Sequence, residues 1–307
     1  MAGKHVQILI LGAGCAGLTA GIYAARAGAG VLILEKGIPG GQAALTASID
    51  NYPGLPHMDG VSLMGRMEEQ ARQSGAEIRC TGVISVEPGE KRVVTQDGTF
   101  TADALILATG AVPRELGIPG ETEYRGRGVS YCASCDGFFY RGKDIYVVGG
   151  GNSAGEEALH LAELGGRVIL LVRKGALRCD DAIRRRLLSH PKIEVLYHRE
   201  LTEIRGREHI EALTIRDTQT GLARTVPAQG CGVFIFIGYR PASDLLAGKL
   251  ALDENGYVMT DENLQTALPG VFAAGDVRRK KLRQIVTAAA DGALAAFQAC
   301  QFCSHMI

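Results

Sequence analysis

The sequence lacks an excess of either charge and lacks a long apolar run. Thirty-three lysines and arginines balance thirty-three aspartates and glutamates, so no long-range field would attract nucleic acid or an anionic membrane. The longest apolar runs, among them Val233–Ile237, suit buried strands and are far shorter than the roughly 18 residues of a membrane span. The first residues lack the apolar segment and cleavage site of a secretory signal. We therefore expect a cytoplasmic protein that binds neither nucleic acid nor membrane.

Metal-ligand spacing is also missing from the seven histidines, so we expect no metal site. Eight cysteines in a reducing compartment argue against a disulfide framework and favour thiol chemistry at particular cysteines. Cys132 and Cys135 form a Cys-x-x-Cys pair, which is compatible with a zinc half-site, a structural bridge or a redox couple. A bridge that closes so short a loop removes little unfolded-chain entropy, and no second ligand pair lies at finger-like spacing. The redox couple is therefore the preferred interpretation.

The beginning of the chain has the pattern of a dinucleotide-binding unit. The apolar run Val6–Leu11 ends at the glycine loop Gly12–Gly17, and apolar residues at helical spacing follow. A second apolar run, Val31–Leu34, ends at Glu35, an acid about 20 residues beyond the glycines. Strand, glycine turn, helix, strand and acid are all present, which makes the signal strong.

The same pattern recurs later in the chain. Ile145–Val148 leads into the loop Gly149–Ala154, and a further apolar run, Val168–Leu171, follows a helical segment. When the two patterns are superimposed, Glu35 of the first falls on Val172 of the second. An acid at this place accepts hydrogen bonds from a ribose 2′-hydroxyl but repels a 2′-phosphate, and the second unit has lost that repulsion.

Positive charge follows Val172 in the second unit. Arg173, Lys174 and Arg178 would suit a 2′-phosphate. A solvated basic loop is the alternative interpretation.

The two patterns predict an α/β fold with two Rossmann-like dinucleotide-binding domains, the second inserted in the first. The length of 307 residues is in keeping with two domains. A buried strand at Ala104–Leu107 ends the first part, and the chain returns to the first domain after Gly238. The expected limits are 1–115 for the first part of domain one, 116–241 for the inserted domain and 242–307 for the second part of domain one.

Taken together, the motifs resemble those of the low-molecular-weight thioredoxin reductases, class II members of the pyridine nucleotide-disulfide oxidoreductase family. The resemblance covers almost the whole chain, in the family's order. It is carried by Gly12–Gly14, Gly40–Gln42, Asp50–Gly54, Ala108–Gly110, Gly126–Ser130, Cys132–Tyr140, Gly270–Val277 and Arg283–Gln284.

By this resemblance, domain one holds FAD, with the pyrophosphate at the N-terminus of the first helix. Glu35 would bind the adenosine ribose, and Asp276 would meet the ribityl chain. The implied FAD residues are Gly12, Gly14, Ala16, Gly17, Glu35, Lys36, Gly41, Gln42, Asn51, Val83, Ala108, Thr109, Gly110, Gly275, Asp276, Arg283, Gln284 and Ile285.

The resemblance assigns NADPH to the inserted domain, with Glu156 or Glu157, on the helix after the loop, approaching the nicotinamide side. The implied residues are Gly149, Gly151, Asn152, Ser153, Ala154, Glu157, Arg173, Lys174 and Arg178. In this family the leading residues of the basic motif are usually His-Arg-Arg, whereas here they are Val172, Arg173 and Lys174. Lysine offers a point charge where arginine offers a bidentate fork, so NADH is also possible as a donor.

The implied reaction passes electrons from NADPH through FAD to a Cys132–Cys135 disulfide and then to thioredoxin or a thioredoxin-like protein. Cys135 would face the flavin, Cys132 would attack the partner's disulfide, and Asp136 would exchange protons with the thiols. Phe138 and Phe139 could form a docking patch, although core packing is the alternative. The resemblance also implies a homodimer.

Other functions stay open at this point. The same fold could take electrons from NADH, ferredoxin or reduced flavin, could oxidise small dithiols, or could serve as a non-catalytic flavin redox sensor. Cys300 and Cys303, which the family does not ordinarily have as a redox pair, would share one helical face. They are either an added relay or two small hydrophobic residues, and we favour the second.

Overall fold

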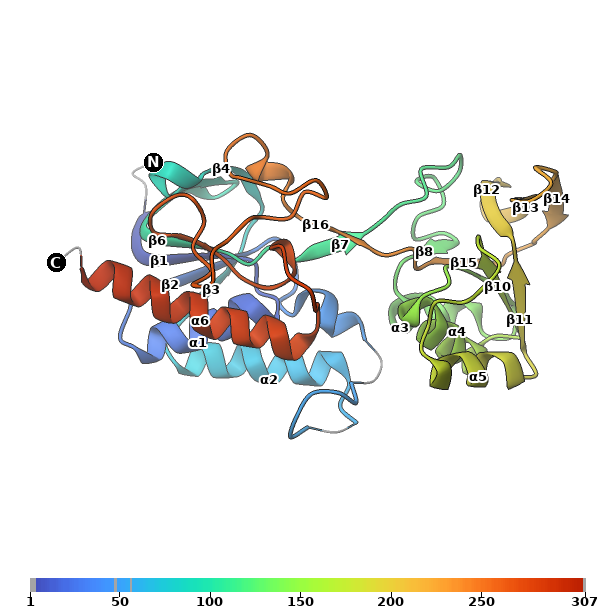
Figure 1. Cartoon of the computed structure of the whole chain (residues 1–307), viewed down its shortest axis with the longest axis horizontal. Helices are drawn as coiled ribbons and strands as arrows, with labels where there is room; N and C mark the ends of the chain where they lie inside the picture. The colour runs from blue at the N-terminus through green and yellow to red at the C-terminus, as the bar shows by residue number, and fades with distance from the viewer. Residues whose placement is uncertain (1–3, 47–48, 56, 306–307) are drawn as a thin grey trace. The chain divides into compact units, whose positions relative to one another are not determined.

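The computed structural model describes residues 4–46, 49–55 and 57–305. The chain forms two compact units (Figure 1). Unit 1 comprises Met1–Val112 and Arg240–Ile307, and unit 2 comprises Pro113–Tyr239. The chain therefore leaves unit 1, completes unit 2 and returns. The two connecting segments contain β7 (Ala111–Pro113) and β16 (Tyr239–Pro241), which pair with each other.

Unit 1 is built on a mixed sheet with the strand order β3-β2-β1-β6-β5-β4, and β17 pairs with β6. Its strands are β1 (Lys4–Leu11), β2 (Val31–Glu35), β3 (Glu77–Cys80), β4 (Val83–Glu87), β5 (Arg92–Thr95), β6 (Gly98–Leu107) and β17 (Val271–Ala273). β1 is parallel to β2 and β6, β2 to β3, and β17 to β6, whereas β5 is antiparallel to both of its neighbours. The carboxyl ends of the parallel strands therefore meet at one edge of the sheet, where α/β proteins bind ligands.

Three helices, α1 (Cys15–Arg26), α2 (Gly60–Gln73) and α6 (Ile285–Ser304), lie on one face of this sheet (Figure 1). Successive side chains of a strand point to opposite faces. Ile8 and Ile10 of β1 accordingly belong to the buried cluster that contains the helices. Leu9 and Leu11 belong to the cluster on the other face. Because both faces of β1 are covered, its sequence is continuously apolar.

The last helix, α6, is long and apolar enough to cross a membrane by length and composition alone. One side of it packs within unit 1. It packs against α1 so closely that a Cβ on Gly292 would lie 2.2 Å from the carbonyl oxygen of Ala16. It also carries Asp291, which is only 8% exposed.

Unit 2 contains a parallel sheet in the order β11-β10-β9-β15-β8 and an antiparallel sheet in the order β12-β13-β14. The strands are β8 (Val129–Ser130), β9 (Asp144–Val148), β10 (Arg167–Val172), β11 (Ile193–Tyr197), β12 (Arg199–Gly206), β13 (Ile210–Asp217), β14 (Ala223–Pro227) and β15 (Gly232–Ile235). The helices are α3 (Ala133–Asp136), α4 (Asn152–Leu164) and α5 (Asp181–Ser189). The apolar run Val233–Ile237, expected as one strand, extends two residues beyond β15, and Ile237 is 38% exposed.

The Gly292 contact generates a stability prediction. Gly292→Ala should lower the free energy of unfolding by about 2–3 kcal/mol, because the added methyl group meets main-chain atoms that cannot rotate away. Gly65→Ala is the matched control, since Gly65 is exposed within α2 and a Cβ there would meet nothing within 4 Å. That control should raise stability by about 0.5–1 kcal/mol. Urea unfolding measures both, and a neutral Gly292→Ala would contradict the contact.

Candidate redox and dinucleotide site

The first glycine loop brings the end of β1 and the start of α1 into main-chain contact. A Cβ on Gly17 would lie 1.8 Å from the carbonyl oxygen of Gly12, and Gly12 itself has φ +104°. Neither position accepts a side chain. The arrangement leaves the first N–H groups of α1 directed toward the carboxyl edge of the sheet, where they can bind a phosphate.

The polar residues predicted around this loop come together at that edge. Glu35, at the end of β2, accepts hydrogen bonds from Ala13 N at 2.8 Å and Gly37 N at 3.1 Å. Gly41 approaches Gly14, since a Cβ on Gly41 would lie 3.2 Å from Gly14 Cα. Backbone hydrogen bonds join the strand ends. Gly12 N donates to Leu34 O, Ala108 N to Leu11 O, and Ala274 N to Leu107 O. Several other predicted FAD residues lie at strand ends. Lys36 follows β2, Val83 is the first residue of β4, and Ala108, Thr109 and Gly110 come directly after β6.

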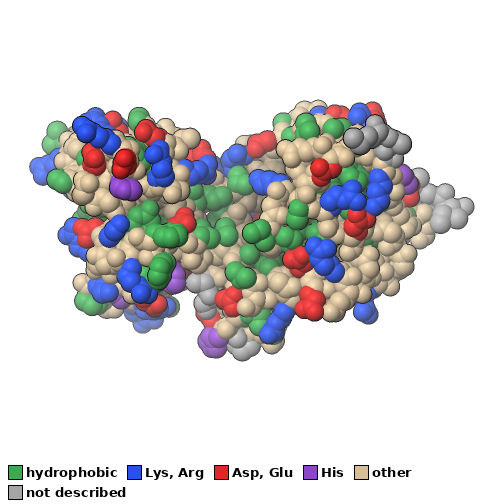
Figure 2. Space-filling view, turned by 180° about the vertical axis from the view of Figure 1, so that it is seen from behind, with side chains coloured by type: hydrophobic (Ala, Val, Ile, Leu, Met, Phe, Trp, Pro, Cys, Tyr) green, Lys and Arg blue, Asp and Glu red, His purple; other side chains and the backbone are tan. Residues whose placement is uncertain are grey.

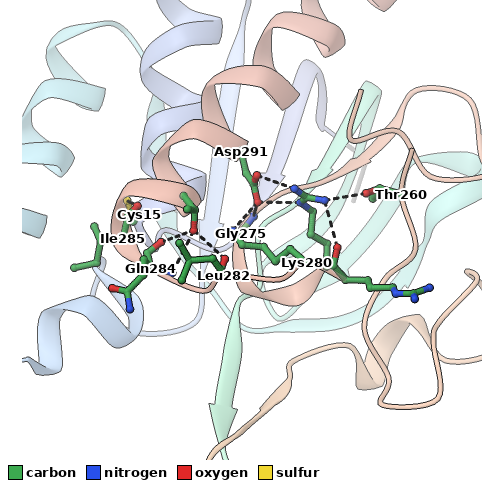
Figure 3. Close-up of polar contacts among 11 residues, drawn as sticks. Cys15, Thr260, Gly275, Lys280, Leu282, Gln284, Ile285 and Asp291 are labelled. Carbon is green, nitrogen blue, oxygen red and sulfur yellow. Dashed lines mark hydrogen bonds and ion pairs between the residues drawn. The ribbon is translucent and has the colours of Figure 1, made fainter. Parts of the chain in front are cut away.

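Two predicted residues meet across long sequence separations. Asn51 Nδ2 donates to Gln284 Oε1 at 3.1 Å. Gln284 also caps α6 in a reciprocal arrangement with Thr287 (Figure 3). The Cys15 thiol donates to Ile285 O at 3.3 Å, and burial is the main reason that the pKa of Cys15 is raised to about 12. Cys15 is therefore an inert, protonated thiol that joins α1 to α6.

The geometry fits a polar cofactor. Within the described residues, Asp276 Oδ1 and Arg283 Nε are buried without a hydrogen-bond partner. Burial raises the pKa of Asp276. Buried polar atoms normally have partners, and leaving one unpaired costs about 1–3 kcal/mol. A ligand with hydroxyl groups would satisfy both atoms, as FAD would. The guanidinium of Arg283 lies 3.9 Å from the centre of the Tyr257 ring, which holds it in place.

Asp291 forms a network that fixes the loop before Asp276, and sequence reasoning missed it (Figure 3). Its carboxylate accepts two hydrogen bonds from Arg278 at 2.9 Å, one from Lys280 at 2.9 Å and one from Gly275 N at 3.0 Å. Burial alone would raise the pKa of Asp291, but these hydrogen bonds outweigh it and hold the pKa below its usual range. The Gly275–Asp276 turn is thereby anchored to α6.

The second glycine loop repeats the main-chain contact of the first. A Cβ on Gly149, which has φ +151°, would lie 2.3 Å from Phe236 O and 2.7 Å from the Cβ of Ala154. Gly151 caps the N-terminus of α4. Gly150 packs on Val172, the residue that replaces the acid of the first unit.

Further predicted residues lie on α4. The side chain of Asn152 exchanges two hydrogen bonds with Asp180, at 2.9 Å and 2.8 Å, so only its backbone is open to a phosphate. Ser153 lines a small cavity together with Tyr131 and Phe236. Burial, with a smaller contribution from Glu156, raises the pKa of Glu157 to about 7. Glu157 therefore exchanges its proton near neutral pH.

Three cations follow Val172 in the loop after β10. Arg173, Lys174 and Arg178 are exposed, and no carboxylate among the described residues pairs with them. Arg178 N donates to Gly150 O at 2.6 Å, which ties this basic loop to the glycine loop. Elsewhere, on the face shown in Figure 2, basic and acidic side chains are interspersed over both units.

The Cys132–Cys135 pair is a disulfide in unit 2, with its Cα atoms 5.4 Å apart. Cys132 caps the short helix α3, and its Sγ accepts a hydrogen bond from Cys135 N at 3.1 Å. Cys132 is half-buried and Cys135 is exposed. A Cβ on Gly137 would lie 2.9 Å from Leu161, so the redox segment rests on α4, the helix that begins at the nucleotide loop.

Glu121 is a second residue that sequence reasoning missed. It is 3% exposed and accepts hydrogen bonds from Leu116 N at 2.8 Å, Gly117 N at 2.6 Å and the Tyr131 hydroxyl at 2.6 Å. Glu121 therefore ties the segment that enters unit 2 to the residue before Cys132. No periodic pattern in the sequence marks such a contact.

The remaining cysteines do not pair among the described residues. Cys303 is buried, Cys300 is half-buried, and burial raises the pKa of both thiols. Their surroundings match the interpretation as small hydrophobic residues.

Comparison with known proteins identifies the family of this chain. Residues 6–292 match the family described as pyridine nucleotide-disulphide oxidoreductase. The chain belongs to this family. It is 43% identical over 300 residues to a thioredoxin reductase of Peptoclostridium litorale, with 95% of each chain covered. Over 299 residues it is 42% identical to that of Treponema pallidum, with 96% of each covered.

Solved structures agree with the family assignment. The thioredoxin reductase of Lactococcus lactis in its FR conformation has a TM-score of 0.92 at 40% identity and covers 98% of this chain and 99% of its own. That of T. acidophilum has a TM-score of 0.90 at 32% identity and covers 99% of this chain and 100% of its own. The predicted fold class, family resemblance and enzyme class, an NAD(P)H-dependent flavoprotein disulfide reductase, are confirmed. The family implies FAD and a pyridine nucleotide.

The Asp291 network generates a second stability prediction. Asp291→Asn should destabilise the protein by about 3–5 kcal/mol, because it leaves two cations without their carboxylate, and Arg278 and Lys280 are only 18% and 7% exposed. Asp244→Asn, which removes an exposed ion pair with Arg240, should change stability little. Equal Tm values for the two variants would contradict the prediction.

The difference in stability between wild type and Asp291→Asn should depend on pH in a definite direction. The folded-state pKa of Asp291 is lowered, so its contribution is fully present above the unfolded pKa of about 3.9. It is lost as the pH falls through the folded pKa. The stability gap between wild type and Asp291→Asn should therefore close in acid, which unfolding measured from neutral to acidic pH can check.

Proposed function

We propose that this chain reduces the disulfide of a thioredoxin-like protein with electrons from NADPH, through the Cys132–Cys135 pair. The observation that carries the proposal is the placement of this disulfide on α4, the helix that begins at the second glycine loop. The second glycine loop and the redox segment are thus both attached to the same helix, α4. The thioredoxin reductases described above, which align along almost the whole chain, support the same activity.

The residues of unit 1 bind and orient FAD. When bound, FAD supplies two-electron chemistry between a nicotinamide and a disulfide. The N–H groups at the start of α1 hold its pyrophosphate, Glu35 takes the adenosine ribose, and Asp276 takes the ribityl hydroxyls. The network around Asp291 keeps Gly275 and Asp276 in position for this contact.

Cys132 is the thiolate that attacks the partner. Its sulfur accepts the N–H of Cys135 and lies 3.4 Å from Ser134 Oγ, and hydrogen bonds of this kind stabilise a thiolate. The Cys132 thiolate forms a mixed disulfide with one partner sulfur and releases the other as a thiolate. The Cys135 thiolate then attacks Cys132, which restores the internal disulfide and frees the partner dithiol. Asp136 exchanges protons with the thiols, and Cys135 is the flavin-side sulfur.

Phe138 and Phe139 form the docking patch for the partner. They are 62% and 69% exposed, and their rings pack edge to face with centres 6.5 Å apart. The guanidinium of Arg141 lies 4.9 Å from the ring centre of Phe138. Exposed aromatic side chains fixed in this way are typical anchors of protein interfaces. Their exposure favours docking over core packing.

NADPH is the preferred donor in this proposal. Arg173, Lys174 and Arg178 are unpaired within the described residues, and Val172 presents no acid to a 2′-phosphate. Lys174 makes the preference weaker than an arginine would.

The enzyme acts as a cytoplasmic homodimer in this proposal. The homodimer is supported by the apolar face of α6, on which Val286, Leu294 and Phe297 are 38%, 37% and 55% exposed. Exposed apolar side chains on one helix face are typical of a subunit interface.

Substitution of the cysteines tests the relay. Cys132→Ser and Cys135→Ser should each lower thioredoxin reduction by at least about 10³-fold, because serine cannot form the disulfide. Both variants should retain FAD and NADPH-dependent reduction of a dye that accepts electrons from the flavin. Asp136→Asn should slow thioredoxin turnover by about 10-fold or more while FAD stays bound. Retention of thioredoxin turnover in a cysteine variant would contradict the proposal.

Kinetics with the two nicotinamides test the donor. The kcat/KM for NADPH should exceed that for NADH, and Lys174→Arg should increase the ratio by about 3–10-fold, because arginine binds phosphate with a bidentate fork. The exposed cation Arg207, in the turn between β12 and β13, provides a control, and Arg207→Lys should leave the ratio unchanged. A wild type that prefers NADH would refute the assignment.

A further inference from the structure

His198 lies at the carboxyl edge of the unit 2 sheet, next to the basic loop that follows β10. The strand register pairs Val172 with Tyr197, so His198 and Arg173 are the next residues on the two neighbouring strands. The backbone N–H of His198 donates to Lys174 O at 3.3 Å. His198 therefore adjoins the loop that carries the three unpaired cations.

The imidazole of His198 covers Gly175 within that loop. A Cβ on Gly175 would lie 2.7 Å from Nε2 and 2.9 Å from Cε1 of His198. The ring thus contacts the loop backbone between Lys174 and Arg178. The ring is half-buried, and no residue in the described ranges forms a hydrogen bond or ion pair with it. Its two ring nitrogen atoms therefore have no hydrogen-bond partner within the described ranges.

The backbone of His198 is held in an unusual conformation. Its φ is +54°, in the left-handed region that residues other than glycine seldom adopt, although asparagine, aspartate and histidine adopt it more often than the rest. His198 O accepts hydrogen bonds from Thr218 N at 2.9 Å and from Arg199 Nη1 at 3.0 Å. Thr218 Oγ1 also donates to Arg173 O at 3.1 Å. Such conformations persist where the surroundings enforce them and cluster at ligand sites.

The charged groups around His198 leave it among cations. Arg173 and Lys174 come from the loop after β10, Arg199 from β12 and Asp217 from β13. The single acid of this group, Asp217, is paired with Arg199. Hydrogen bonds from the N–H groups of Thr220 and Gln219 hold its pKa below the usual range. A dianionic ligand would satisfy this concentration of positive charge.

We propose that His198 binds the 2′-phosphate of the nicotinamide cofactor together with the basic loop, and thereby contributes to selection of NADPH over NADH. The inference rests on the proposed function, in which NADPH is the donor. An imidazole N–H donates a hydrogen bond to a phosphate oxygen.

Kinetics of the FAD-loaded enzyme with both nicotinamides test the proposal. His198→Asn removes the ring but keeps a residue that tolerates the left-handed backbone. The KM for NADPH should rise about 5–10-fold, whereas the KM for NADH and both kcat values should change less than about twofold. His198→Arg restores a phosphate donor and should retain the preference for NADPH. The exposed His209, in the turn between β12 and β13, provides the control variant His209→Asn, which should change neither KM.

The outcomes distinguish the inference from the function on which it rests. An unchanged ratio in His198→Asn, with NADPH still preferred by wild type, overturns the role of His198 alone. A wild type that prefers NADH overturns the donor assignment, and the role of His198 with it. Equal losses with both nicotinamides together with a lower Tm would assign His198 a structural role and also overturn the inference.

Discussion

The close approach of main chain to main chain at the two glycine loops is the constraint on which the rest of the molecule depends. At Gly17 and at Gly149 there is room for a hydrogen atom but not for a methyl group. Each contact fixes a helix N-terminus at the carboxyl edge of a parallel sheet, where its N–H groups face outward. The polar residues of unit 1 and the basic loop of unit 2 are arranged around these two points.

The two units use one scaffold with opposite electrostatics. Glu35 ends its strand with a carboxylate held by Ala13 N, whereas Val172 ends the equivalent strand against Gly150 and cations follow it. In unit 2 the helix after the glycine loop has a second role, because the far part of α4 supports the redox segment through Leu161. Distinct chemistry thus depends on a few side chains at strand ends, while the backbone plan is unchanged.

Much of this was predictable because its signals are local. Continuous apolar runs mark strands covered on both faces, as at β1, and glycine spacing marks the loops. The Asp291 network, the contact of Glu121 with Tyr131 and the place of His198 beside Gly175 depend on residues distant in sequence, and no period announces them. The run at Val233–Ile237 shows the same limit, since a tertiary contact of Phe236 with Gly149 accompanies the end of the strand.

The discontinuity of unit 1 has a consequence for the order in which the protein is made. Unit 2 is a single contiguous segment, so all of its strands and helices have been synthesised before the last part of unit 1 emerges. Until then α1 lacks its packing partner α6 and β6 lacks β17. Domains fold as units during synthesis, so the inserted unit matures first and the enclosing unit, begun earlier, closes last. The apolar face of α1 stays uncovered during that interval. The incomplete unit 1 is therefore the species most exposed to aggregation during synthesis.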